Sequence, residues 1–116
     1  MLSVELPWPS RTLHPNARVH HMARARAAKK ARADAGWAAK ASGIRRISAD
    51  ALKVTAIFFP PDNRRRDRDG MLSACKSYFD GIADVIGVDD HRWDIAIRKG
   101  DPRPNGAVRI EIEVMR

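Results

Sequence analysis

The residues of this chain best suited to chemistry are a group of aspartates. Asp67 and Asp69 are separated by one residue, and the pair Asp89 and Asp90 follows after a segment with helical spacing. Carboxylates at positions i and i+2 point the same way where the backbone is extended. A third acid returning after the helix would complete a cup of oxygen ligands, which hard divalent cations such as Mg²⁺ prefer. The spacing therefore predicts a site for a divalent metal ion.

The charge of the chain suggests what such a metal site would act on. The formal net charge is +8, and residues 11–46 carry ten Lys or Arg against one acid, Asp34. Residues 62–94 hold eight of the fourteen acids. A basic surface attracts phosphate backbones. An acidic cup within a basic protein predicts metal-dependent chemistry on nucleic acid.

Cysteine usage and hydropathy exclude several classes of protein. Cys75 is the single cysteine, which excludes an intramolecular disulfide and a Cys-rich zinc site, and we expect it to be an inert core residue. The four histidines match no zinc pattern. The sequence has no apolar run of about 18 residues and no signal-peptide pattern, so we expect a cytoplasmic protein without a membrane partner.

The elements that must position the acids can be read from periodicity and from Pro and Gly. We expect one domain over residues 1–116, with strands at residues 1–6, 51–59, 92–99 and 107–115. Helices are expected at residues 21–41 and 71–86. The order β-α-β-α-β-β predicts a small α+β (mixed α/β) fold. The three tryptophans are expected in the core or in an interface rather than as base-stacking platforms.

The expected second helix has two faces. Its core stripe consists of Leu72, Cys75, Phe79, Ile82, Ala83 and Ile86. Asp69, Ser73, Lys76 and Asp80 are spaced by 4, 3 and 4 and line an adjacent polar stripe. The acid pair therefore lies at the start of the helix, with a lysine about two turns further along.

The motifs resemble those of the RusA-type Holliday junction resolvases. The segment LPWPS at residues 6–10 is similar to the Pro-rich opening of that family. The segment RRDRDG at residues 65–70, then Lys76, FDGI at residues 79–82 and VDD at residues 88–90 resemble its central signature. The likeness covers nearly the whole chain.

The resemblance implies a function and a set of roles. Members are small homodimeric endonucleases, mostly encoded by phages and prophages, which act in DNA recombination and repair. They bind four-way junctions and cut two opposing strands symmetrically with Mg²⁺ or Mn²⁺. The resemblance implies that Asp67, Asp69 and Asp90 bind the metal and that Lys76 is a catalytic residue. A divalent ion there would activate a water for attack on the phosphodiester.

The chain departs from the family pattern at two positions. Gly70 stands where the family commonly has Asn, and Ser73 stands where it often has Lys. Lys76 lies one turn further along the same stripe and either fills the role of that lysine or leaves it unfilled. Asp89 is the alternative to Asp90 as a ligand. Asp80 either orients Lys76 or an arginine, or is a surface acid paired with Lys76.

Basic residues on both sides of the acids are expected to contact DNA phosphates. They are Arg64, Arg65, Arg66 and Arg68 around the acid pair, and Arg24, Lys29 and Lys30 on the first helix. Two alternatives stay open: a metal-independent DNA-binding module, and a metal nuclease that acts on flaps or other branched DNA. Preference for four-way junctions, and the homodimer, follow from the resemblance alone.

Overall fold

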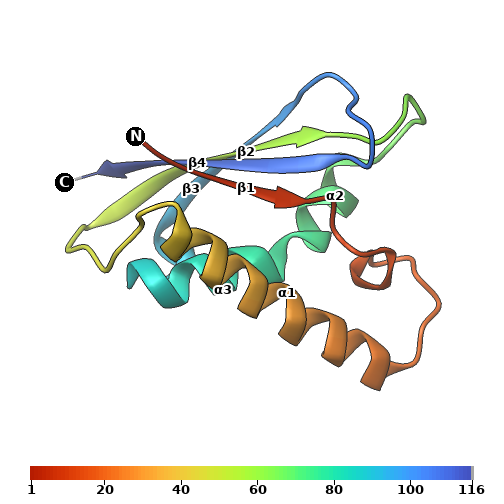
Figure 1. Ribbon diagram of the computed structural model, residues 1–116, viewed down its shortest axis with the longest axis horizontal. Coiled ribbons are helices and arrows are strands. Elements are labelled where there is room, and N and C mark those ends of the chain that lie inside the picture. Colours follow the sequence, from red (N-terminus) through yellow and green to blue (C-terminus); the bar gives the residue numbers. More distant parts are fainter. Residues whose placement is uncertain (116) are drawn as a thin grey trace.

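The computed structural model describes residues 1–115 (Figure 1). Its strands are β1 (Leu2–Pro7), β2 (Ala51–Phe59), β3 (Trp93–Lys99) and β4 (Ala107–Met115). Its α-helices are α1 (His21–Ala41), α2 (Arg68–Ala74) and α3 (Lys76–Ile86), and the short 3-10 helices are η1 (Arg11–Leu13) and η2 (Asp90–Arg92). The helices and one mixed sheet confirm the α+β class.

The expected single helix over residues 71–86 is wrong, because the structure has two helices that meet at Cys75. The amide of Cys75 bonds back to the carbonyl of Leu72 at 3.0 Å, which is a tight turn, before α3 begins at Lys76. Cys75 is neither Gly nor Pro, so no local breaker explains the bend. Both helices bury side chains against the sheet, and this packing favours the change of direction.

The sheet has the order β1-β4-β2-β3. β4 is antiparallel to both β1 and β2, whereas β2 and β3 are parallel. Both crossovers, from β1 to β2 and from β2 to β3, run in the same direction across the sheet. Connections of the usual right-handed sense therefore place α1 and α3 on the same face, as Figure 1 shows.

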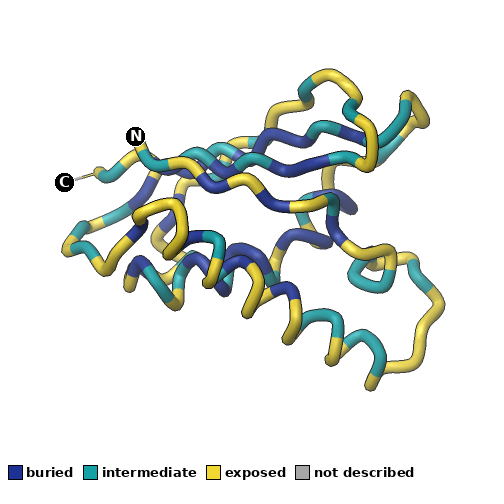
Figure 2. The backbone as a smooth tube through the Cα atoms, viewed as in Figure 1, coloured by how far each residue is buried: buried dark blue, intermediate teal, exposed yellow. Residues whose placement is uncertain are grey.

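The core lies between this sheet face and the helices (Figure 2). Its largest fully buried side chains include Phe58, Phe79 and Leu52. α1 contributes only small buried residues, Ala31, Ala35 and Ala39, which let it approach α3 closely. The approach is so close that a Cβ on Gly81 in α3 would overlap the carbonyl oxygen of Arg32 in α1.

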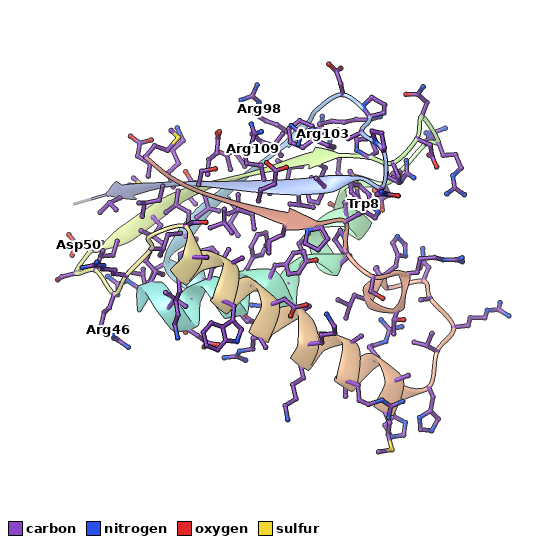
Figure 3. All side chains as sticks on the ribbon, viewed as in Figure 1. Trp8, Arg46, Asp50, Arg98, Arg103 and Arg109 are labelled. Atoms are coloured by element: carbon purple, nitrogen blue, oxygen red, sulfur yellow. The ribbon has the colours of Figure 1, made fainter. Side chains whose placement is uncertain are left out.

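Within residues 1–115, no helix covers the other face of the sheet. Arg98, Arg103 and Arg109 lie on this side in Figure 3. Arg103 and Arg109 both pair with Glu5 of β1, at 2.8 and 3.5 Å. In the part of the chain that the structure describes, no helix is long and apolar enough to cross a membrane.

Candidate active site

The predicted acid pair stands at the start of α2. Asp67 is the N-cap residue, with extended dihedral angles (φ −82°, ψ 130°), and its carboxylate accepts from the amide of Asp69 at 3.4 Å. Aspartate is a favoured N-cap, and a second acid in the first turn suits the helix dipole. Both side chains are exposed. Neither forms an ion pair with a Lys, Arg or His among residues 1–115, although four arginines stand within five residues in sequence.

Lys76 binds two acids at once. Its ammonium group donates to Asp80 at 3.0 Å and also to the carboxylate of Asp90. These bonds, that to Asp90 foremost, raise the pKa of Lys76. The i,i+4 pair of Lys76 with Asp80 is the contact that both sequence-based interpretations of Asp80 predicted, so it does not distinguish between them. The bond to Asp90 adds a link between α3 and η2 that sequence spacing did not reveal.

Asp89 is used differently from its neighbour Asp90. Its carboxylate caps η2 by accepting from the amide of His91 at 3.1 Å, and lies 2.9 Å from the imidazole Nδ1 of the same residue. These bonds lower the pKa of Asp89 to about 2. Of the two acids, Asp90 is the one joined to Lys76, and Asp89 stays exposed.

The structure therefore brings Lys76, Asp80 and Asp90 together but leaves Asp67 and Asp69 as a separate pair. Within residues 1–115, no group of three or more His, Cys, Asp or Glu is arranged to hold one metal ion. The donor chemistry of Asp67 and Asp69 still suits Mg²⁺, because both are exposed carboxylates that no basic side chain of the described residues neutralises. Asp90 is instead bonded to the ammonium of Lys76.

A hollow of about 720 Å³ lies beside the acid pair, and we name it the arginine hollow. Its lining comes from the segment after β1 with η1, from the end of β2 and the loop after it, and from α2. Four arginines line it, Arg11 from η1 and Arg64, Arg65 and Arg66 from the loop after β2. Asp67 lines the same hollow. One candidate metal ligand and four guanidinium groups thus share one surface.

The four arginines are not equally available. Arg66 donates to the carbonyls of Asp62 and Arg64 at 3.2 and 3.1 Å and pairs with the Asp62 carboxylate at 2.9 Å. Arg64 also pairs with that carboxylate, at 3.2 Å. These bonds, led by the one from the backbone amide of Arg64, lower the pKa of Asp62. Arg11 and Arg65 form no ion pair with any described residue, so both can bind an incoming anion.

His14 explains the glycine at position 70. Its Nε2 lies 2.8 Å from the place that a Cβ on Gly70 would take. Nδ1 accepts from the amide of Asn16 at 3.1 Å, which places the proton of the neutral ring on Nε2. A larger residue at position 70 would displace this ring. The sequence did not predict the contact of His14 with α2, because no local pattern joins residues so far apart.

The other predicted DNA contacts have mixed surroundings. The guanidinium of Arg24 donates to the carbonyls of His14 and Ala17 at 3.2 and 2.8 Å, and so fixes the loop before α1. Lys30 pairs with Asp34 at 2.6 Å within α1. Lys29 and Arg68 are exposed. Of these predicted DNA contacts, Arg24 has a clear structural role, because its guanidinium fixes the loop before α1.

Comparison with known proteins gives a relative but no function. No family model matches the chain. Over 96 residues the chain is 44% identical to an uncharacterized protein of Xylella fastidiosa strain Temecula1. The match covers 80% of this chain and 63% of that protein, so the chain spans less than two thirds of the length of its relative.

Proposed function

We propose that this protein is a Mg²⁺-dependent endodeoxyribonuclease of the RusA type, which resolves four-way DNA junctions by paired symmetric nicks. The observation that carries the proposal is the arginine hollow, in which Asp67 lies beside four arginines. A nuclease must bring a phosphodiester next to its metal ligands. The arginines supply the anion-binding surface, and Asp67 and Asp69 supply the carboxylates.

Each group has a defined part in this proposal. Arg11 and Arg65 hold the backbone of the DNA through its phosphates, because their charges are not neutralised by acids. Asp67 and Asp69 would hold Mg²⁺ (or Mn²⁺), with Asp90 joining once Lys76 releases it. When bound, the ion supplies Lewis acidity at the scissile phosphate and activates a water. Lys76, once free, offsets the charge that builds on the phosphoryl oxygens.

The proposal includes a homodimer and a cellular role. Two symmetric cuts in opposing strands require two active sites related by a twofold axis, which a pair of identical subunits provides. The role is in DNA recombination and repair, in the cytoplasm of a bacterium and encoded by its genome or by a prophage. The resemblance of the motifs supports both points.

A metal-independent DNA-binding module is the second candidate. The observation that favours it is the Lys76–Asp90 bond, which already neutralises one of the three proposed ligands. Such a module would use the arginine hollow for binding and would not cut. A nuclease for flaps or other branched DNA would share the same residues and differ only in the shape of its substrate.

Cleavage of a synthetic four-way junction tests the proposal. The junction and a linear duplex of the same sequence are incubated with the protein in Mg²⁺ and in EDTA. We expect paired nicks on opposing strands of the junction, in Mg²⁺ alone. Tight binding without nicks in Mg²⁺ or Mn²⁺ would support the binding module instead. Equal cutting of a flap substrate would favour the broader nuclease.

A further inference from the structure

We propose that the arginine hollow binds one unpaired nucleotide of the DNA, with its base against Trp8 and its phosphate at Arg11 and Arg65. This inference rests on the proposed function and specifies the substrate of the same site. It predicts that the protein recognises a nucleotide that has left the base stack, as found at a branch point or in a single strand.

The size and lining of the hollow fit a whole nucleotide. Its volume of about 720 Å³ lies within the range of about 300–1,000 Å³ for small-molecule pockets. Trp8, Met71 and Ala74 add apolar surface to the arginines. The backbone of an intact duplex needs only surface cations. The aromatic and apolar lining of the hollow increases affinity only if a base enters it. A base can enter the hollow only when it is unpaired.

Trp8 is held in place for such a contact. Its ring packs edge-to-face on Phe58, with centroids 6.1 Å apart and planes at 78°. Phe58 is fully buried in β2, so the indole is anchored to the rigid end of the sheet, where Figure 3 labels it. The guanidinium of Arg66 lies 5.4 Å from the centre of the indole ring. Trp8 is half-buried and lines the hollow, so in this proposal the base stacks on the part of the indole that faces the hollow.

The charges of the hollow separate the base end from the phosphate end. Arg66 is tied to Asp62 and to two carbonyls, so it serves as part of the wall beside Trp8. Arg11 and Arg65 remain for the phosphate. Asp67 on the same surface would then lie near the backbone of the bound nucleotide. Its position links nucleotide binding to the proposed cutting site.

Fluorescence titration in EDTA tests this inference without any cleavage. Trp37→Phe removes the exposed indole on α1, so that Trp8 and the buried Trp93 remain as reporters. The probes are a ten-residue oligothymidylate, free thymidine monophosphate, and a blunt hairpin duplex of equal charge whose strands are joined by a non-nucleotide linker, so that it has no unpaired base. We expect the single strand to quench the signal and to bind at least about 10-fold more tightly than the hairpin. The monophosphate should bind far more weakly than the single strand.

Variants assign the binding to the hollow. Arg65→Ala and Arg11→Ala should each weaken the single strand at least about 5-fold, whereas the matched control Arg98→Ala, on the open sheet face, should not. Trp8→Ala should cost about 5- to 100-fold, the usual range for a base-stacking residue. Trp8→Phe keeps an aromatic ring and tests the site should the alanine variant unfold.

Some outcomes overturn the inference and leave the proposed function intact. Equal affinity for hairpin and single strand, or no quenching at saturation, would show that no base enters the hollow. A monophosphate that binds as tightly as the oligonucleotide would make it a site for free nucleotides. Conversely, single-strand binding at Trp8 by a protein that does not cut junctions would support this inference and contradict the nuclease.

Discussion

The ammonium group of Lys76 is bound by the carboxylate of Asp90, which joins the first residue of α3 to the first residue of η2. Asp80 completes the contact from one helical turn further along, at 3.0 Å. In this arrangement the Lys76 ammonium is bonded to two carboxylates, and one of them, that of Asp90, is a proposed metal ligand. Under the proposed function, the lysine and the metal ion would therefore compete for the carboxylate of Asp90.

Replacement of Lys76 separates its two roles. Lys76→Ala frees Asp90 for the metal but removes the cation proposed to stabilise the transition state. We expect the rate of junction cleavage to fall about 100- to 1,000-fold, as for the loss of other transition-state donors. Affinity for Mg²⁺, followed by calorimetry, should rise because the competing cation is gone. A variant that cuts as fast as the wild type would show that the lysine takes no part in the reaction.

Two glycines that face each other across α1 and α3 should respond in opposite ways. In Gly81→Ala the new Cβ would overlap the carbonyl of Arg32, and because that atom is backbone the two helices must move apart. We expect a loss of about 1–3 kcal/mol in the free energy of unfolding. Gly36→Ala is the control, since its Cβ would lie 3.5 Å from the carbonyl of Gly81.

The control should gain up to about 1 kcal/mol, because alanine favours a helix over glycine. Urea denaturation followed by circular dichroism measures both changes. Equal stability of the two variants would mean that α1 and α3 do not approach as closely as described.

The Arg32–Asp84 pair should make stability depend on pH. Two bonds of 2.7 Å join these residues across α1 and α3 and lower the pKa of Asp84. An acid with a lowered pKa stabilises the fold above its unfolded pKa of about 3.9, and this contribution is lost as the pH falls through the folded value.

Asp84→Asn should therefore lower the Tm at pH 7 by about 1–4 °C, as expected for an exposed pair, and this deficit should be smaller at pH 3, below the unfolded pKa. Asp34→Asn, which breaks a pair within α1 alone, is the matched comparison. Thermal scans of the wild type and both variants at pH 7 and at pH 3 measure these changes in Tm. A deficit as large at pH 3 as at pH 7 would contradict an electrostatic cause.

Much of the fold was predictable because its signals are local. The predicted bounds of α1, β2 and β4 agree with the structure, since alanine-rich and β-branched runs end at Gly, Pro or polar residues. The bend at Cys75 was not predictable. It has no local breaker and depends on how α2 and α3 pack against a sheet that forms from distant parts of the chain.

The local contacts of the candidate site were predictable from the sequence, whereas its long-range contacts were not. The Asp67–Asp69 pair and the Lys76–Asp80 pair follow from spacings of two and four residues. The bond of Lys76 to Asp90 spans 14 residues and a loop, and the arginine hollow joins residues more than 40 positions apart. Such contacts depend on tertiary structure. Trp8, expected in a core or an interface, packs against the core and also lines this hollow.

The measurement that most directly tests the central claim is junction cleavage by wild type and Asp69→Asn in parallel, at saturating Mg²⁺. The substitution preserves shape and removes one negative charge from the acid pair. We predict that the variant binds the junction in EDTA as tightly as the wild type but makes paired nicks at least about 100-fold more slowly. Nicking by Asp69→Asn at the wild-type rate would contradict metal-dependent cutting by the carboxylates at the start of α2.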